Sequence, residues 1–410
     1  MNRWQLPEAI SDLLPAQAQS LESLRRAILD CYRASGYQLV VPPLVEYVDS
    51  LLIGRGGDLD LKTFKLVDQL TGRTLGVRAD ITPQVARIDA HLLQGRQVTR
   101  LCYCASVLRT RPNGLEASRE PIQIGAELYG HAGVEADIEA IDLLLRSLAL
   151  AGIGRVRLDL CDMGLARQLL AGLPAGVAND RLEDEVFELL QARDLPALRQ
   201  LLAAAGDEPA ARAILELADC FGPAERVLGR ARSAFARWPQ ALSVLDQLER
   251  VIASPRLRQH AGAVEFALDL ADVRGFRYHT GLSFSAYAER HARAIGRGGR
   301  YDGIGAAFGR SRAATGFSLD LRQLVELREA PAPEGLVVAP WSEDAALTAL
   351  IDRLRREGNI VLQLLPGQTE PGPDRPVERI IEWVQGRWQV LPAPVPGAPC
   401  GRTDDRRLEP

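Results

Sequence analysis

The sequence predicts an α+β protein: an antiparallel sheet flanked by helices, with a helical insertion and a small C-terminal α/β unit. Strand-like runs joined by turns, with no helix between them, fill much of residues 62–129. Residues 164–259 are rich in Ala, Leu and Arg and almost lack β-branched runs, which favours helices. A Pro-rich stretch at 329–335 then precedes a strand–helix–strand pattern.

Length and composition are those of a globular protein. The chain has 410 residues, of which 47% are hydrophobic and 25% charged, enough for one large domain and one or two smaller ones. The net charge of -4 weighs against a nucleic-acid-binding role. The six cysteines include no C-x-x-C pair, so we expect no metal site and reduced thiols. No signal peptide or apolar membrane span is recognisable, and we expect a cytoplasmic protein.

The N-terminal third begins with a helix and continues in strands. Residues 17–35 place Leu21, Leu24 and Ile28 on one helical face, and Gly36 follows where helices commonly end. Further expected elements are strands at 37–41, 62–68, 74–78, 99–108, 121–129 and 156–161, turns at 71–72 and 113–114, and a helix at 134–151.

The later elements define the expected domain organisation. After the helical insertion we expect strands at 264–270 and 282–286, a glycine-rich loop at 297–300, and a strand followed by a helix at 314–327. The C-terminal unit should contain a strand at 336–339, a helix at 344–356, a strand at 360–364 and one helix or strand within 380–391. The predicted domains are a core at 1–328, a linker at 329–335, a small domain at 336–392 and a disordered tail at 393–410.

Three groups of short segments occur in the order and spacing of one family. They are residues 36–46; residues 78–87, 108–111 and 123–128; and residues 273–281, 298–303 and 315–322. Together they resemble the class II aminoacyl-tRNA synthetases, and among these the histidyl-tRNA synthetases, over roughly residues 6–325. The segment after the linker resembles a shortened anticodon-binding domain.

The resemblance fails where the family activates its amino acid with ATP. That reaction needs fixed positive groups around the phosphates and, in the family, a Glu that reads the adenine. Arg109 keeps the α-phosphate position, but Arg111 stands in place of the Glu and cannot accept a hydrogen bond. In the third motif Asp320, Arg322 and Gln323 replace Gly, Glu and the Arg that holds the γ-phosphate. We therefore expect little or no adenylate formation.

The amino-acid pocket of the family is better retained. The resemblance assigns Asp80, Thr82 and Gln123 to the α-amino group, Glu127 to the imidazole and Arg274 to the carboxylate. Tyr278 matches the first residue of a Tyr-Tyr pair and His279 replaces the second, while Arg109 can also serve a carboxylate. This set of eight residues is the predicted histidine site. Taken singly, each residue also fits a structural role; Asp80 and Thr82, for example, fit a turn at Pro83.

A histidyl-synthetase-like chain with a damaged ATP site resembles the regulatory subunits of ATP phosphoribosyltransferase. The resemblance implies a non-catalytic subunit, without cofactor or metal, that supports the first step of histidine biosynthesis and mediates feedback by histidine. It also implies a short-form catalytic subunit as partner and a self-dimer within a hetero-octamer, with no tRNA or membrane partner. A divergent histidyl-tRNA synthetase is the alternative, and a synthetase-like amidating or editing factor is a third hypothesis.

Overall fold

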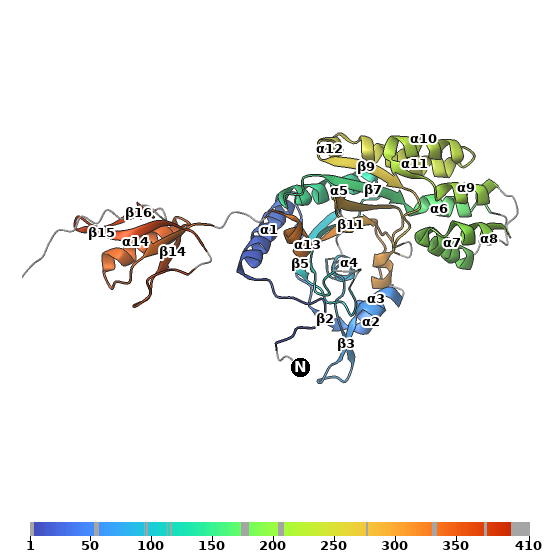
Figure 1. The fold of residues 1–410 in the computed structure, drawn as a ribbon. Coiled ribbons are helices and arrows are strands. Elements are labelled where there is room, and N and C mark those ends of the chain that lie inside the picture. The colour runs from blue at the N-terminus through green and yellow to red at the C-terminus, as the bar shows by residue number, and fades with distance from the viewer. Residues whose placement is uncertain are drawn as a thin grey trace, which may run out of the picture. The chain divides into compact units, whose positions relative to one another are not determined.

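The computed structural model describes residues 4–394 except 53–56, 94, 96, 113, 115–116, 174–179, 204–208, 276–277, 330–333 and 373–374 (Figure 1). The chain forms two compact units, Met1–Glu329 and Ala330–Pro410. Most of the predicted linker, most of the predicted tail and position 113 of one predicted turn lie outside the described residues. Among the described residues, no helix is both long and apolar enough to cross a lipid bilayer.

The first unit is organised around a nine-stranded sheet in the order β1-β5-β6-β12-β11-β10-β7-β9-β8. These strands are β1 (Gln38–Leu39), β5 (Thr99–Ser106), β6 (Ile122–Tyr129), β7 (Val156–Asp162), β8 (Phe221–Pro223), β9 (Val264–Asp269), β10 (Leu282–Ala288), β11 (Ala294–Arg300) and β12 (Ala314–Asp320). The sheet is mixed rather than purely antiparallel, because β1 pairs with β5 and β7 pairs with β9 in parallel. Long connections separate the strands of both parallel pairs, as parallel pairing requires.

Helices cover one face of this sheet. The predicted N-terminal helix is α1 (Pro15–Ala34), the predicted helix at 134–151 is α5 (Val134–Leu150), and α13 (Leu321–Leu327) follows β12. Ile28 of α1 and Leu144 of α5 belong to one buried cluster with Ile124 and Phe317 of the sheet. Burying each such side chain stabilises the folded state by about 1.5–3 kcal/mol relative to leaving it exposed.

A smaller sheet and several short helices lie between β1 and β5 in the chain. The strands β2 (Val45–Tyr47), β4 (Thr74–Val77) and β3 (Phe64–Val67) pair in that order, antiparallel and separate from the large sheet. The sequence did not predict the helices here, which are α2 (Val48–Leu51), α3 (Gly57–Lys62), α4 (Thr82–Arg87) and the π-helix η1 (Ile88–Leu93). Their few residues provide too little periodicity to separate a helix from a turn.

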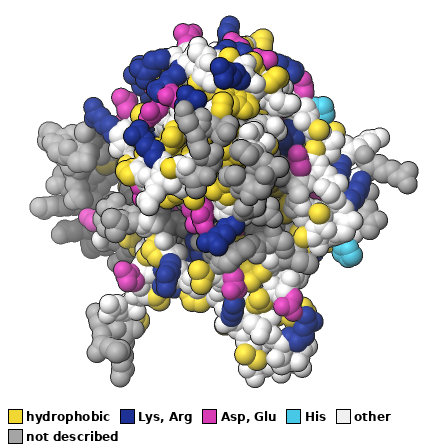
Figure 2. All heavy atoms as spheres, turned by 90° about the vertical axis from the view of Figure 1, so that its right-hand side faces the viewer, with side chains coloured by type: hydrophobic (Ala, Val, Ile, Leu, Met, Phe, Trp, Pro, Cys, Tyr) yellow, Lys and Arg dark blue, Asp and Glu magenta, His cyan; other side chains and the backbone are white. Residues whose placement is uncertain are grey.

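The predicted helical insertion is confirmed, with one short strand inside it. Its helices are α6 (Met163–Leu170), α7 (Asp180–Ala192), α8 (Leu195–Ala203), α9 (Pro209–Leu217), α10 (Ala224–Ala234), α11 (Pro239–Ala253) and α12 (Pro255–Arg258). The exception is β8, which pairs antiparallel with β9. Basic and acidic side chains are interspersed on the face shown in Figure 2. Arg232 of α10, for example, pairs with Asp246 and Glu249 of α11.

The predicted glycine-rich loop at 297–300 is instead part of strand β11. β11 pairs with β10 on one side and with β12 on the other. A Cβ atom at Gly298 would lie 2.3 Å from the Gly316 carbonyl oxygen and 2.4 Å from the Phe284 ring, so glycine is needed for close packing and not for a turn. A 3₁₀-helix, η2 (Ile304–Phe308), follows β11.

The face of the large sheet opposite α1 and α5 is polar and rich in glycine. The pairing register places Glu127, Gly316 and Gly299 in one row across β6, β12 and β11. The next row holds Gly125, Ser318 and Arg297. Because alternate residues of a strand share a face, these two rows lie on the same side of the sheet. Small residues in these rows leave room above the sheet for a site.

The second unit is a four-stranded sheet in the order β14-β13-β15-β16 with one helix. Its elements are β13 (Leu336–Ala339), α14 (Ala345–Arg356), β14 (Ile360–Gln363), β15 (Val377–Val384) and β16 (Arg387–Pro392). The predicted strand–helix–strand unit is confirmed, and β13 and β14 are parallel. The single element expected within 380–391 is two strands, joined by a turn in which Gln385 and Gly386 both have positive φ.

Candidate functional site

A cavity of about 120 Å³ lies above the glycine-rich face of the large sheet. Its lining residues are Asp80, Thr82, Glu127, Tyr278, His279, Arg297, Gly298, Gly299, Tyr301, Gly316, Phe317 and Ser318. They come from β6, β11, β12, the start of α4 and the loop before β10. Five of the eight predicted site residues are therefore brought together: Asp80, Thr82, Glu127, Tyr278 and His279.

Glu127 is the buried acid of this cavity, with 1% of its surface exposed. The hydroxyl of Tyr103 donates to its Oε1 over 3.1 Å, and the hydroxyl of Tyr301 donates to its Oε2. Burial raises the pKa of Glu127 to about 8, and the nearby Asp80 adds to this, although hydrogen bonds from Tyr301 and Thr82 act in the opposite direction. At neutral pH this carboxyl group is therefore mostly protonated until a cationic or N–H donor group approaches it.

A second carboxylate enters the cavity from the segment before α4. Asp80 Oδ1 accepts a hydrogen bond from Gln123 Nε2 over 2.9 Å and one from the Thr82 backbone N–H over 3.2 Å. The Oε1 atom of Gln123 in turn accepts from the Ile81 backbone N–H over 3.0 Å. Gln123 does not line the small cavity. Its contacts fix the position of Asp80 instead.

Aromatic rings form one wall of the cavity. Tyr278 stacks on Tyr301 with ring centroids 4.9 Å apart and planes 17° apart, and the His279 ring meets Tyr278 edge-on at 5.1 Å. His279 Nδ1 lies 3.3 Å from the Arg300 carbonyl oxygen. Such a wall suits a flat, partly polar ring.

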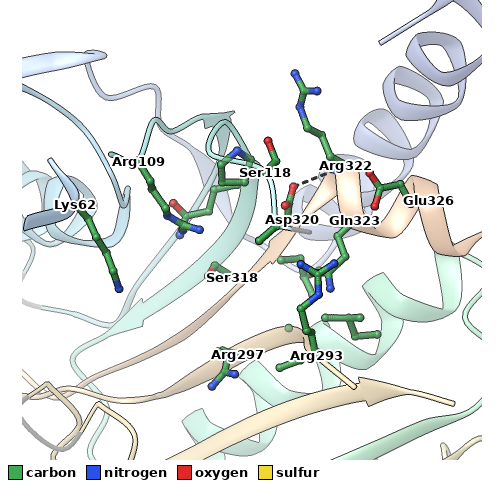
Figure 3. Close-up of a pocket in the computed structure, with 17 residues that line it drawn as sticks. Lys62, Arg109, Ser118, Arg293, Arg297, Ser318, Asp320, Arg322, Gln323 and Glu326 are labelled. Atoms are coloured by element: carbon green, nitrogen blue, oxygen red, sulfur yellow. Dashed lines mark hydrogen bonds between the residues drawn. The ribbon is translucent and has the colours of Figure 1, made fainter. Parts of the chain in front are cut away.

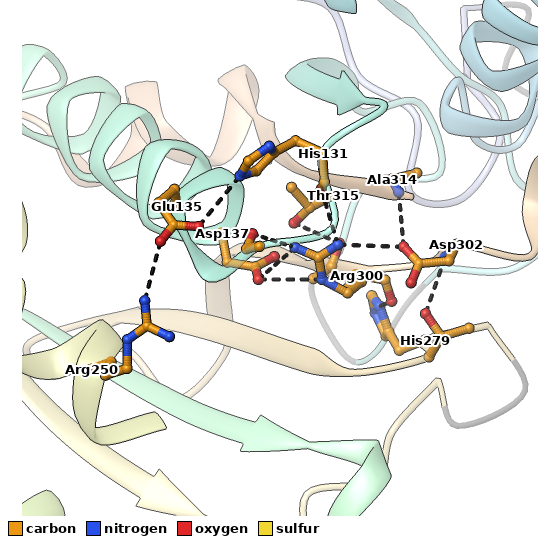
Figure 4. Close-up of polar contacts among 12 residues, drawn as sticks. His131, Glu135, Asp137, Arg250, His279, Arg300, Asp302, Ala314 and Thr315 are labelled. Atoms are coloured by element: carbon orange, nitrogen blue, oxygen red, sulfur yellow. Dashed lines mark hydrogen bonds and ion pairs between the residues drawn. The ribbon is translucent and has the colours of Figure 1, made fainter. Parts of the chain in front are cut away.

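The Arg300 side chain fixes the strand end that carries this wall. Its guanidinium donates to Asp137 Oδ2 of α5 over 2.7 Å and to the Gly133 carbonyl oxygen over 3.0 Å (Figure 4). Asp137 is nearly buried, and burial raises its pKa while Arg300 opposes that shift. This ion pair ties the end of β11, directly before Tyr301, to helix α5.

A larger cavity of about 470 Å³ adjoins the first (Figure 3). Its lining residues are Lys62, Arg109, Ala117, Ser118, Pro121, Gln123, Arg293, Ala294, Ile295, Gly296, Arg297, Ser318, Leu319, Asp320, Arg322, Gln323 and Glu326. Arg297 and Ser318 line both cavities. The predicted site residues Arg109 and Gln123 belong to the larger one.

The three altered positions of the third motif have other partners in the structure. Asp320 accepts from the backbone N–H groups of Arg322 and Ile122 over 3.0 and 3.2 Å, and so begins α13 and joins it to β6. Burial raises the pKa of Asp320. Arg322 extends away from Arg109 and Arg297 (Figure 3) and donates to the Ser11 carbonyl oxygen over 3.0 Å.

Gln323 and Arg111 complete the set of altered positions. Gln323 Nε2 lies 2.9 Å from His291 Nε2. Arg111 is exposed and lines neither cavity. Asp320, Arg322 and Gln323 therefore contact other parts of the fold while lining the larger cavity, and Arg111 faces solvent.

The predicted carboxylate partner, Arg274, lines neither cavity. Its guanidinium binds Asp272 through two hydrogen bonds of 2.5 Å and also donates to the Tyr287 hydroxyl over 3.0 Å. Arg297 lies in both cavities and makes no hydrogen bond or ion pair with any residue that the structure describes. Arg297 is exposed to solvent, and desolvation by neighbouring protein atoms together with repulsion from Arg274 lowers its pKa.

Sequence reasoning missed Tyr103, Tyr301, Arg297 and Gly316 as site residues. Tyr301 and Gly316 lie inside motifs that carried the family resemblance, but their contacts with Glu127 depend on the fold: a hydrogen bond from the Tyr301 hydroxyl, and strand pairing at Gly316. Tyr103 reaches Glu127 from the neighbouring strand β5, and no local pattern indicates this contact. Arg297 was missed because residues 297–300 were predicted to be a loop. As a strand, this segment places Arg297 and Gly299 on the same face of the sheet.

Comparisons with known proteins agree with this architecture. Residues 9–324 match the family model described as "Histidyl-tRNA synthetase", and residues 334–391 match "ATP phosphoribosyltransferase subunit HisZ C-terminal domain". A solved structure from Bacillus halodurans, titled as an ATP phosphoribosyltransferase regulatory subunit/histidyl-tRNA synthetase, superposes with a TM-score of 0.77. It covers 90% of this chain and 95% of that one at 24% identity, which supports the fold alone. The predicted synthetase-like fold is confirmed.

Two curated relatives are similar over nearly their whole length. Both are named "ATP phosphoribosyltransferase regulatory subunit". The relative from Ralstonia nicotianae is 51% identical over 96% of this chain and 99% of its own length. The relative from Ralstonia pickettii is 49% identical over 95% of this chain and 98% of its own length. The chain therefore belongs to the family of ATP phosphoribosyltransferase regulatory subunits, built on a core of the histidyl-tRNA synthetase type.

Proposed function

We propose that this chain is a non-catalytic regulatory subunit of a short-form ATP phosphoribosyltransferase and that free histidine binds in its smaller cavity. The observation that carries the proposal is the combination of groups in that one cavity. Two carboxyl groups, a wall of aromatic rings and one unpaired guanidinium surround a space of about 120 Å³. These groups complement the ammonium, imidazole and carboxylate of a small amino acid.

Each part of histidine has a partner of matching chemistry. The α-ammonium group would meet Asp80 and the Thr82 hydroxyl. An imidazole N–H would donate to Glu127, with the ring beside Tyr278 and His279. The carboxylate would pair with Arg297, because Arg274 is already held by Asp272.

Binding without reaction suits a sensor. Asp320 begins helix α13 and Gln323 contacts His291, so neither supplies a positive group to a phosphate. Without such clamps the negative charge that develops during adenylate formation is poorly stabilised. Histidine would then bind and dissociate unchanged.

Regulation requires partners, and we propose two. One is the short-form catalytic subunit, which would be active only in the complex. The other is a second copy of this chain within a hetero-octamer. The exposed side chains of Leu39 (53%), Val41 (80%) and Leu44 (51%) at and after the edge strand β1 support self-association there.

Histidine would shift such an assembly toward an inactive state because it would bind the inactive state more tightly than the active one. We place this assembly in the cytoplasm and give it no tRNA partner.

Calorimetric titration of the full chain with histidine tests the binding proposal. The Glu127→Gln variant replaces the protonated acid with a neutral group of the same shape, so folding should persist. We expect its affinity for histidine to fall by about tenfold or more, because a charge-assisted hydrogen bond is lost. Equal affinity of the variant and the wild type would overturn the proposed site.

A pyrophosphate–ATP exchange assay tests the absence of catalysis. The chain should show no histidine-dependent exchange of pyrophosphate into ATP. Robust exchange would show that the chain activates histidine and would contradict the regulatory assignment.

A further inference from the structure

We propose that Arg300 and Asp137 are positioning residues for the histidine cavity, and that helix α5 carries the effect of histidine binding from them to the helical insertion. The inference rests on the proposed binding of histidine in the smaller cavity. Neither residue lines that cavity. Both act through its aromatic wall, which Tyr278, His279 and Tyr301 form.

The backbone and the aliphatic stem of Arg300 hold the loop that carries part of this wall. The Arg300 carbonyl oxygen accepts a hydrogen bond from the Thr280 backbone N–H over 2.8 Å and lies 3.3 Å from His279 Nδ1. A Cβ atom at Gly281 would lie 3.3 Å from Arg300 Cδ, so the loop and the stem are in close contact. Tyr301 is the next residue along the chain. A shift of Arg300 therefore moves both parts of the wall.

The guanidinium group of Arg300 is buried at the N-terminal end of α5. Besides Asp137 and the Gly133 carbonyl oxygen, it donates to the His131 carbonyl oxygen over 3.3 Å (Figure 4). Only 8% of Arg300 and 3% of Asp137 are exposed. A helix N-terminus carries a partial positive charge, so this position is unfavourable for Arg300 unless Asp137 compensates its charge. Asp302 lies 3.5 Å from the same group but is itself exposed, so its contribution is smaller.

Helix α5 carries a second buried acid, which binds the helical insertion. Asp142 is fully buried and lies further along the same helix than Asp137. Its carboxylate accepts hydrogen bonds from Arg256 Nε of α12 over 2.8 Å and from Gln259 Nε2, directly after α12, over 3.1 Å. His260 Nε2 lies 2.8 Å from the same carboxylate. One helix therefore joins the wall of the cavity to the end of the insertion through two buried acids.

Another contact between α5 and the insertion lies on the surface. Arg250 of α11 pairs with Glu135, in the first turn of α5, over 3.2 Å, and both side chains are more than half exposed (Figure 4). Exposed ion pairs contribute little, and salt screens them. The buried contacts at Asp137 and Asp142 therefore carry the proposed coupling, because the charges there cannot be stabilised by water instead.

Calorimetric titration of the full chain with histidine tests the positioning role. Asp137→Asn leaves Arg300 uncompensated, and histidine affinity should fall by about tenfold. Arg300→Lys keeps the charge but loses the fork that reaches Asp137 and the Gly133 carbonyl oxygen together, so it should also weaken binding by about fivefold or more. The second variant keeps the test decisive if Asp137→Asn does not fold.

Glu135→Gln is the matched control, since it makes a similar change in the exposed pair and should leave histidine affinity within about twofold. Unchanged affinity in Arg300→Lys and in folded Asp137→Asn, with histidine bound by the wild type, would overturn the positioning role. Absence of histidine binding by the wild type would instead contradict the proposed site itself.

Hydrogen exchange of the full chain tests the coupling through α5. Histidine should slow exchange in both α5 and α12 of the wild type by about twofold or more. Asp142→Asn should bind histidine with an affinity within about threefold of the wild type, because Asp142 contacts the insertion and not the wall. It should keep the slowing in α5 and lose that in α12.

A merely structural role would lower histidine affinity equally in Asp142→Asn and Asp137→Asn, since both acids are buried. Arg256→Gln removes a donor to Asp142 from α12 itself and should give the same loss of slowing, so the test does not depend on the folding of Asp142→Asn. Equal losses of affinity in the two Asp variants, or slowing in α12 that persists in Arg256→Gln, would contradict the coupling.

Discussion

Glu127 on β6 lies directly opposite Gly316 on β12, and its carboxyl group occupies the space that a side chain at position 316 would need. A Cβ atom at Gly316 would lie 1.6 Å from Glu127 Oε2 and 2.6 Å from the Ala126 carbonyl oxygen. The buried acid and the glycine opposite it therefore form one structural feature. The floor of the small cavity depends on both.

The Gly316→Ala substitution should displace the Glu127 carboxyl group and weaken histidine binding by at least about tenfold. The methyl group cannot be placed while Glu127 keeps its contacts with Tyr103 and Tyr301. Gly303→Ala is the matched control, because its Cβ would have no neighbour within 4 Å. Calorimetry on both variants checks the prediction, and unaltered binding by Gly316→Ala would show that Glu127 is not needed where we place it.

The raised pKa of Glu127 predicts a pH-dependent stability. An acid whose pKa rises on folding from 4.5 to about 8 stabilises the folded state fully below the lower value and loses this contribution as the pH rises to the upper one. The free energy of unfolding should fall by up to about 1.4 kcal/mol per pH unit in that window. Chemical unfolding of wild type and Glu127→Gln between pH 5 and 8 measures this contribution. If the stability difference between the two proteins did not change with pH, the assignment of the pKa would be wrong.

Histidine binding should also release a proton. Glu127 is mostly protonated at pH 7 and must ionise to hold a cation or to accept a charge-assisted hydrogen bond. The binding enthalpy of the wild type should therefore vary with the ionisation enthalpy of the buffer. Subtracting the same measurement on Glu127→Gln removes the titration of histidine itself. Identical buffer dependence in both proteins would contradict proton release from Glu127.

Arg297, and not Arg274, should carry the carboxylate of histidine. Arg297→Met keeps the aliphatic length but removes the charge, and it should weaken histidine binding by about tenfold or more. Arg274→Met should leave that affinity within about twofold, because Asp272 and Tyr287 already occupy the Arg274 guanidinium. If calorimetry showed a larger loss of histidine affinity for Arg274→Met than for Arg297→Met, Arg274 would be the carboxylate partner instead.

Asp320 should matter for folding rather than for ligand binding. Asp320→Ala removes the acceptor for the first turn of α13 and for the Ile122 N–H, which should cost about 1–3 kcal/mol in the free energy of unfolding. Asp320→Asn keeps an oxygen acceptor and should cost much less. A loss of histidine affinity in Asp320→Asn without a loss of stability would show that the carboxylate serves the site directly.

The sequence predicts those features that depend on neighbouring residues, and it misses those that depend on contacts between residues far apart in the chain. Long amphipathic helices such as α1 and α5 end within two residues of their predicted bounds, because their apolar periodicity is local. The glycine-rich segment of β11 was mistaken for a loop, since its glycines reflect packing against Gly316 and Phe284, which are distant in the sequence. Family resemblance located Glu127 and Asp80. It could not show that Arg274 is bound by Asp272, because that contact depends on the conformation of one loop.

We propose that histidine acts through this chain to control a catalytic partner. The most direct measurement is the activity of a purified short-form ATP phosphoribosyltransferase mixed with wild-type chain or with Glu127→Gln, across a series of histidine concentrations. Both proteins should raise the activity of the catalytic subunit, and half-inhibition of the Glu127→Gln complex should require about ten times more histidine than that of the wild-type complex. Failure of the wild-type chain to raise activity, or the same inhibition curve for both complexes, would contradict the account.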